Sequence, residues 1–143
     1  MTDLTLSLSR TIKASPEAVY AAWLDPATIR RFMAGGADQT VAEARTDPRV
    51  GGRFFILMVA DKEIPHQGTY TALDPYSLIR FTWDSPYSPA DSEVTIRLTP
   101  VPGGTELSLT QEKFLSEGAR DGHREGWARI LERLSATLAA AHA

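Results

Sequence analysis

The sequence of 143 residues contains no cysteine. This absence excludes disulfide bonds, cysteine nucleophiles and zinc sites built on thiolates. The chain also lacks any run of roughly 18 apolar residues, the length that a helix needs to cross a bilayer. Residues 1–14 alternate polar with apolar side chains and do not have the form of a signal peptide. We therefore expect a cytoplasmic protein without a membrane span.

Positive charge is not concentrated either, because 15 Lys and Arg are scattered among 18 Asp and Glu, for a net charge of −3. A nucleic-acid surface needs clustered basic residues, so we expect no nucleic-acid partner. The glycine pairs at 35–36, 51–52 and 103–104 do not belong to GxGxxG or Walker-type phosphate loops, and no HExxH metal motif occurs. We expect neither a cofactor nor a metal ion.

Apolar periodicity predicts a single domain over residues 1–143. A period of two residues marks the strands, and proline, glycine and aspartate between them mark turns, of which Pro102-Gly103-Gly104 is the clearest. Ser15 followed by Pro16 has the form of a helix start. The predicted strands cover residues 4–12, 39–46, 53–59, 63–73, 77–83, 92–101 and 105–112, and the predicted helices cover 16–24, 26–33 and 116–141.

Short connections between consecutive strands favour an antiparallel sheet that buries one face. The C-terminal helix is the element long enough to cover that face, since its predicted length is roughly 35–40 Å. The predicted fold is therefore α+β. It has a curved seven-stranded antiparallel sheet wrapped around the long C-terminal helix, with two short helices after the first strand.

The predicted C-terminal helix changes character along its length. Its second half carries a leucine-rich apolar stripe, whereas its first half places three glycines around Trp127. Each interior glycine costs about 1 kcal/mol relative to alanine, so these glycines need a structural reason. We expect the second half to pack on the core and the first half to line a space. In the second half the stripe includes Ile130, Leu134 and Leu138, with Leu131 beside it, and the glycines are Gly118, Gly122 and Gly126.

Alternation along the strands places several aromatic and polar side chains on the face under this helix. Aromatic walls with a few polar groups are typical of small-molecule pockets, so we expect a small, largely apolar ligand there. The alternative is that Trp83 and Trp127 simply pack in the core and leave no space for a ligand. The predicted ligand-binding residues are His66, Tyr70, Phe81, Trp83, Gln111, His123, Gly126 and Trp127.

Two other uses of the histidines are open at this point. A metal ion between His66 and His123 would lack a third ligand in the sequence. His123 could act as an acid–base group with Gln111 or Tyr70, because a buried histidine can titrate near neutral pH. No Ser-His-Asp set or carboxylate pair can be assembled, so no residue is predicted to be catalytic and binding is favoured over catalysis.

Six short motifs occur in an order that resembles a known family. They are Trp23-Leu24-Asp25-Pro26, Val50-Gly51-Gly52-Arg53-Phe54, Gly68-Thr69-Tyr70, Ile79-Arg80-Phe81-Thr82-Trp83, Gly103-Gly104-Thr105-Glu106-Leu107 and Gly126-Trp127. Together they resemble the family named after the activator of the heat-shock-90 chaperone's ATPase, in the START-like (SRPBCC, Bet v 1-like) superfamily of helix-grip folds. Gln111 stands where a histidine is frequent in that family.

The resemblance implies one helix-grip domain over nearly the whole chain, and it leaves three functions open. The superfamily includes binders of lipids and hormones, cyclases and chaperone cofactors. Binding of a small apolar molecule between sheet and helix is the first expectation. A cyclase- or isomerase-like enzyme using the same cavity is the second, and a protein-interaction or chaperone-cofactor module is the third.

The strand predicted over residues 53–59 is apolar on both faces. A sheet face that is open to water normally carries polar side chains. We therefore expect the outer face near Phe55 and Leu57 to be covered in a homodimer.

Overall fold

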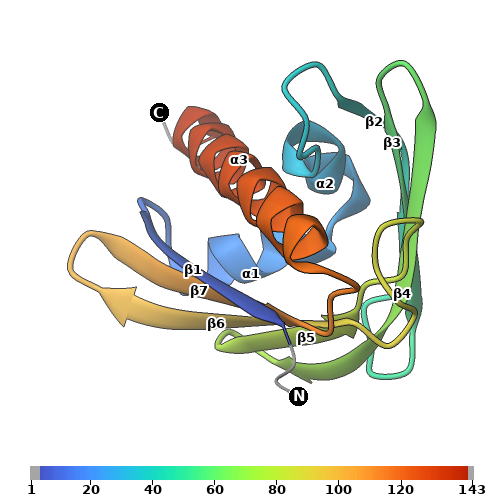
Figure 1. The fold of residues 1–143 in the computed structure, drawn as a ribbon. Coiled ribbons are helices and arrows are strands. Elements are labelled where there is room, and N and C mark those ends of the chain that lie inside the picture. Colours follow the sequence, from blue (N-terminus) through green and yellow to red (C-terminus); the bar gives the residue numbers. More distant parts are fainter. Residues whose placement is uncertain (1–3, 142–143) are drawn as a thin grey trace.

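The computed structural model describes residues 4–141, and Figure 1 shows a curved sheet with a long helix across its concave side. The predicted α+β fold is confirmed. Its strands are β1 (Thr5–Ile12), β2 (Thr40–Thr46), β3 (Arg53–Val59), β4 (Glu63–Asp74), β5 (Leu78–Thr82), β6 (Glu93–Val101) and β7 (Gly104–Glu112), and its helices are α1 (Pro16–Leu24), α2 (Pro26–Phe32) and α3 (Glu117–Ala141).

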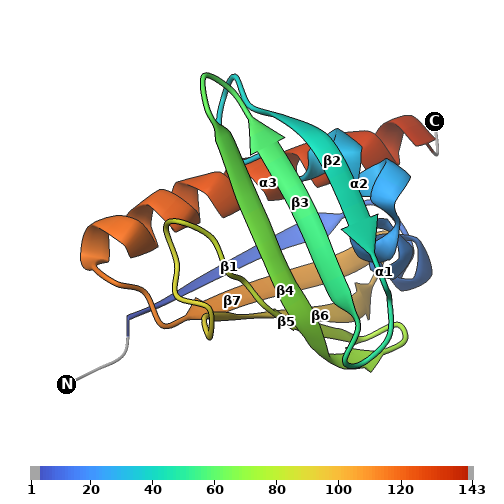
Figure 2. The ribbon, with the colours of Figure 1, turned by 90° about the vertical axis from the view of Figure 1, so that its right-hand side faces the viewer.

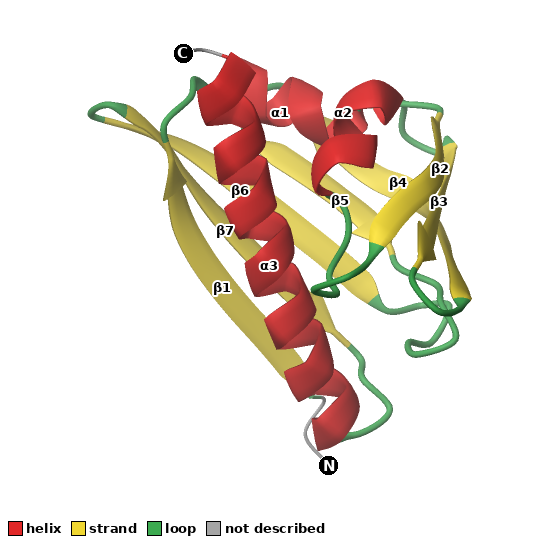
Figure 3. Ribbon diagram, turned by 90° about the horizontal axis from the view of Figure 1, so that it is seen from above, coloured by secondary structure: helices red, strands yellow, loops and turns green. Residues whose placement is uncertain are grey.

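The seven strands form one antiparallel sheet in the order β1-β7-β6-β5-β4-β3-β2. Consecutive strands from β2 to β7 are neighbours, so they form a meander, and β1 joins the far edge beside β7. The two short helices span the distance between the two edge strands (Figure 3). In β2 the register shifts between Val41 and Glu43. A bulge and charged side chains on an edge strand disfavour pairing with another sheet.

Side-chain caps define where the three helices begin. The Ser15 hydroxyl accepts a hydrogen bond from the Ala18 N–H at 3.2 Å, and Pro16 occupies the first helical position. Asp25 ends α1 and also caps α2, because its carboxylate accepts the Thr28 N–H at 3.2 Å. Ser116 caps α3 through the Ala119 N–H at 3.1 Å. The predicted helix starts are therefore confirmed.

The core lies between the concave face of the sheet and all three helices. Side chains from α1 and α2, notably Trp23, Ile29 and Phe32, complete the core near β2 and β3. The second half of α3 packs as predicted, with Leu134 fully buried. The strand residues that the period of two residues places on the face under α3 are all buried: His66, Gly68, Tyr70, Ile79, Phe81, Trp83, Val94, Ile96, Leu98, Leu107, Leu109 and Gln111.

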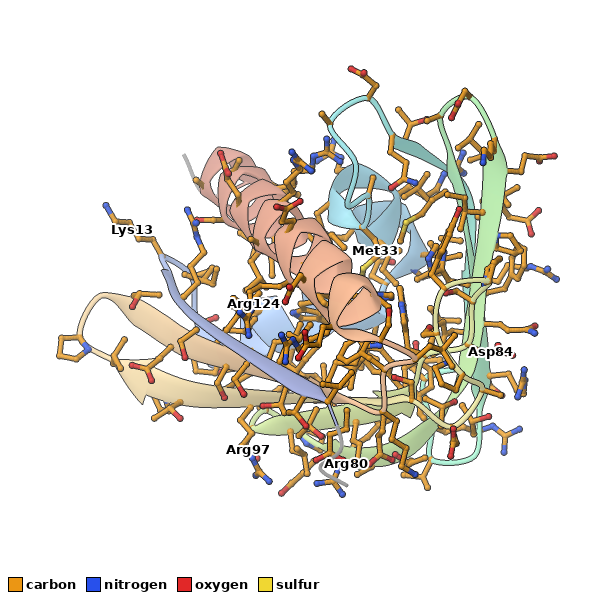
Figure 4. The ribbon with its side chains drawn as sticks, in the orientation of Figure 1. Lys13, Met33, Arg80, Asp84, Arg97 and Arg124 are labelled. Atoms are coloured by element: carbon orange, nitrogen blue, oxygen red, sulfur yellow. The ribbon has the colours of Figure 1, made fainter. Side chains whose placement is uncertain are left out.

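The convex face of the sheet is mainly polar. Figure 4 shows Arg80 and Arg97 extending from it on the side opposite α3. At β3, Phe55 and Leu57 are half-buried rather than fully exposed. The Arg45 guanidinium lies 4.9 Å from the centre of the Phe55 ring, a distance typical of a cation–π contact. Part of the apolar outer face is thus covered within the chain itself.

Candidate functional site

A cleft of about 480 Å³ lies beside the first half of α3. Its volume is within the range of roughly 300–1,000 Å³ that small-molecule pockets occupy. Figure 2 shows this end of α3 extending past β4, next to the loop between β5 and β6. Five of the eight residues predicted to bind a ligand line the cleft: His66, Trp83, His123, Gly126 and Trp127.

The glycines of α3 have two different surroundings. A Cβ atom at Gly122 would meet no atom within 4 Å, so this position borders free space. A Cβ atom at Gly126 would lie 3.8 Å from the Gly35 Cα, which is ordinary contact. At Gly35 a Cβ atom would lie only 3.0 Å from the Gly126 Cα. Gly35 therefore permits the close approach of loop and helix, and Gly122 leaves room in the cleft.

Trp127 forms one wall of the cleft and is held in place by Gln111. The Trp127 Nε1–H donates to Gln111 Oε1 at 2.7 Å, and the Gln111 Nε2 group donates to the Ser92 hydroxyl at 2.9 Å. The Ser92 hydroxyl in turn donates to the Glu112 carbonyl at 2.6 Å. Gln111 is fully buried and does not line the cleft. The structure places it as a support for Trp127.

Tyr70 and Phe81 also lie outside the cleft. They border a separate cavity of about 10 Å³, which is about the minimum that holds one water molecule. Trp83 lines both spaces and separates them, and its ring centre is 4.9 Å from that of Trp127. Burial raises the pKa of the Tyr70 phenol, and the charge of Asp47 adds to this. Tyr70 is therefore a neutral core residue.

His66 is a buried histidine on the sheet side of the cleft. Its ring packs on Trp83 with the ring centres 4.7 Å apart, and its Nδ1 atom has no hydrogen-bond partner among the described residues. Burial lowers the pKa of His66 to about 4, against a smaller raising effect of backbone hydrogen bonding at Ile64, and the charge of His123 lowers it further. His66 is therefore uncharged at neutral pH.

His123 faces the cleft from α3. Its Nδ1 atom is 2.7 Å from the Ala119 carbonyl oxygen, one turn earlier in the helix. Its ring packs on Phe114 with the ring centres 5.0 Å apart. Burial lowers the pKa of His123, while the backbone hydrogen bond to Ala119 partly opposes this effect. Both histidines of the cleft are thus neutral imidazoles at pH 7.

The loop between α2 and β2 forms a further wall that the sequence analysis missed. Gly35, Gly36 and Gln39 line the cleft, and the Gln39 side-chain oxygen accepts the N–H groups of both glycines at 3.0 Å. The Arg133 guanidinium of α3 donates to the carbonyls of Ala34 and, at 2.9 Å, Gly36. These bonds fix the loop on the helix, so this wall has a defined position.

The mouth of the cleft carries exposed apolar side chains. Tyr87 is 49% exposed and Leu115 is 72% exposed, and both line the cleft together with Pro86. Large apolar side chains around an opening are typical of sites that take up apolar molecules. Pro86 and Tyr87 lie between the strands predicted over residues 77–83 and 92–101, and no site residue was predicted there.

The described lining of the cleft is uncharged. No Asp, Glu, Lys or Arg occurs among the described residues that border the cleft. Within residues 4–141, no three His, Asp or Glu side chains are grouped closely enough to hold a metal ion. The arrangement therefore offers aromatic surface and two neutral imidazoles.

Residues 13–139 match the family described as activator of Hsp90 ATPase homolog 1-like protein. This chain belongs to that family. The AHSA1-like protein from Aeromonas hydrophila is similar to it, with 29% sequence identity over 97% of this chain and 94% of that chain, and a TM-score of 0.85. The AHSA1 protein from Silicibacter pomeroyi has 26% identity over 97% of this chain and 100% of that chain, and a TM-score of 0.82.

More distant structures share the fold alone. A protein of unknown function from Staphylococcus aureus has 16% identity over 99% of this chain and 96% of that chain, with a TM-score of 0.85. Among curated proteins, none matches this member of the family. The comparisons therefore establish the Bet v 1-like fold and the family but name no ligand.

None of the helices in residues 4–141 is both long and apolar enough to cross a membrane. The cytoplasmic location expected from the sequence stays a prediction.

Proposed function

We propose that this family member binds a small, largely apolar molecule in the cleft beside the first half of α3. The observation that carries the proposal is the cleft of about 480 Å³, walled by Trp83 and Trp127, with exposed Tyr87 and Leu115 at its mouth. The aromatic walls provide apolar contact area, and the neutral histidines supply a few polar groups. Binding needs no charged or metal-bound group.

A tryptophan fluorescence screen tests this proposal. Two of the three tryptophans line the cleft, so an apolar ligand is expected to give a saturable quench or shift. Gly122→Leu is expected to abolish that signal, because its side chain would occupy the free space beside Gly122. The substitution also favours helix formation, so lost binding would not reflect a weakened helix.

Ala136→Leu is the matched control, since Ala136 is exposed on the same helix and does not line the cleft. This variant should bind like the wild type. A library of lipids, sterols and polycyclic aromatics that gave no saturable change with the wild type would refute the proposed function. Equal binding by wild type and Gly122→Leu would refute the proposed position of the ligand.

The homodimer through the outer face of β3 stays a prediction. Phe55 and Leu57 are half-buried, and Arg45 already covers the Phe55 ring. Sedimentation velocity at tens of micromolar is expected to show a dimer, and Leu57→Asp is expected to shift it toward the monomer. A single monomeric species of the wild type would show that Arg45 and neighbouring side chains suffice to cover this face.

A further inference from the structure

The hydrogen bonds of His123 determine which of its nitrogens is free. The Ala119 carbonyl oxygen can only accept, so Nδ1 at 2.7 Å must carry the hydrogen and donate it. In a neutral imidazole the other nitrogen then has no hydrogen. Nε2 of His123 is therefore an acceptor, held at the cleft by a helix carbonyl and by the Phe114 ring.

Three other polar groups of the lining already have partners inside the protein. The Gln39 oxygen accepts two backbone N–H groups, and the Ser116 hydroxyl accepts the Ala119 N–H. The Trp127 N–H is donated to Gln111. Nε2 of His123, by contrast, accepts no hydrogen bond from the described residues.

His66 is a second polar group of the lining. Its Nδ1 atom is buried without a hydrogen-bond partner in the described part of the chain, while backbone hydrogen bonding at Ile64 and Ile56 acts on the same ring. A polar ligand group that reaches Nδ1 would supply the missing partner.

The chemistry of the lining also excludes one class of ligand. A carboxylate or phosphate buried in the cleft would meet no cation, because no Lys or Arg belongs to the described lining and both histidines are neutral. Burial of an unpaired charge is strongly unfavourable. The cleft thus selects against anions such as fatty acids in their ionised form.

We propose that the ligand is an uncharged apolar molecule with one hydroxyl or N–H group, whose hydrogen is accepted by Nε2 of His123 while its apolar body lies against Trp83 and Trp127. This inference rests on the proposed function and specifies the chemical class of ligand for the same cleft.

Four related probes test the inference on the wild-type protein at pH 7.5: biphenyl, para-phenylphenol, its methyl ether and biphenyl-para-carboxylate. All share one apolar body and differ only in the polar group. The phenol is expected to bind roughly three- to tenfold more tightly than biphenyl, the effect of one net hydrogen bond. The methyl ether keeps the oxygen but lacks the hydrogen, so it should bind no better than biphenyl. The carboxylate should bind most weakly.

His123→Phe supplies the matched variant, because it keeps an aromatic ring and removes the acceptor. It is expected to lose the preference for the phenol over biphenyl, whatever its absolute affinity for biphenyl. Biphenyl binding also reports whether the variant retains a folded cleft. Since the ether comparison uses the wild type alone, the inference can be tested even if the variant does not fold.

The outcomes separate the inference from the proposed function. If biphenyl, the phenol and the ether bind equally, the inference fails and the proposed function stands. Tightest binding of the carboxylate would also overturn the inference, since it would require a cation in the cleft. If none of the four probes binds, both the inference and the proposed function fail for this class of molecule.

Discussion

Replacing Leu134 with alanine is expected to lower the free energy of unfolding by about 2–5 kcal/mol, as large-to-small changes in a packed core do. Leu134 is fully buried in the second half of α3, between Ile130 and Leu138 on the same stripe. Removing its side chain takes apolar surface out of the core and leaves a cavity that neighbouring side chains fill only in part. Urea denaturation followed by circular dichroism measures the change.

Glu132→Ala is the control for this experiment. Glu132 is exposed two residues earlier in the helix, and substitutions at such surface positions usually change stability by less than about 0.5 kcal/mol. A midpoint of Leu134→Ala equal to that of the wild type would contradict the packing of α3 on the sheet. The variant leaves the cleft lining intact, so a folded Leu134→Ala protein should still bind a ligand of the wild type.

Most of the fold was predictable because local signals and long-range packing agree. The alternation along β3 to β7 fixes which side chains face α3, and the caps at Ser15, Asp25 and Ser116 fix the helix starts. Strand ends differ by a residue. The strand predicted over residues 77–83 is β5 (Leu78–Thr82) in the structure, and beyond its end the Trp83 N–H still donates to the Ser92 carbonyl in the register of β5 and β6.

The site was predictable only in part, because alternation gives the face of a residue but not its depth. Tyr70 and Phe81 share a face with residues of the cleft, yet they pack in the core behind Trp83. Gln111 also lies on this face, but the Trp127 indole takes its side-chain oxygen. Depth depends on how α3 crosses the curved sheet, and no local pattern in the sequence encodes that crossing.

The loop walls were missed for a different reason. Gly35 and Gly36 predicted a turn, and the turn is present. Its position against α3, however, depends on a hydrogen bond from Arg133, which is 97 residues away from Gly36 in the chain. The loop with Pro86 and Tyr87 has no periodicity from which a facing side could be assigned. The composition of this loop could have indicated the site, because a large aromatic residue such as Tyr87 in an exposed loop often marks a binding surface.

The stability of this protein is expected to fall between pH 6.5 and pH 4 because of His66. In the unfolded chain a histidine has a pKa near 6.5, whereas burial lowers the pKa of folded His66 to about 4. Between these values the unfolded state binds a proton that the folded state excludes, so acidification favours unfolding. Each pH unit removes about 1.4 kcal/mol, or on the order of 3 kcal/mol over the whole interval. Above pH 6.5 His66 is neutral in both states, so its full contribution to the free energy of unfolding is present.

His66→Gln isolates this effect, because glutamine does not titrate. Urea denaturation of both proteins at pH 7 and pH 4 gives two changes in the free energy of unfolding, and the wild type should lose roughly 3 kcal/mol more than the variant. The carboxylates and His123 are present in both proteins, so their titration largely cancels in the comparison. Below pH 4 the two curves should run parallel again, since His66 is then protonated in both states. Parallel curves over the whole range would mean that water reaches the His66 ring and that its side of the cleft is hydrated rather than closed by Trp83.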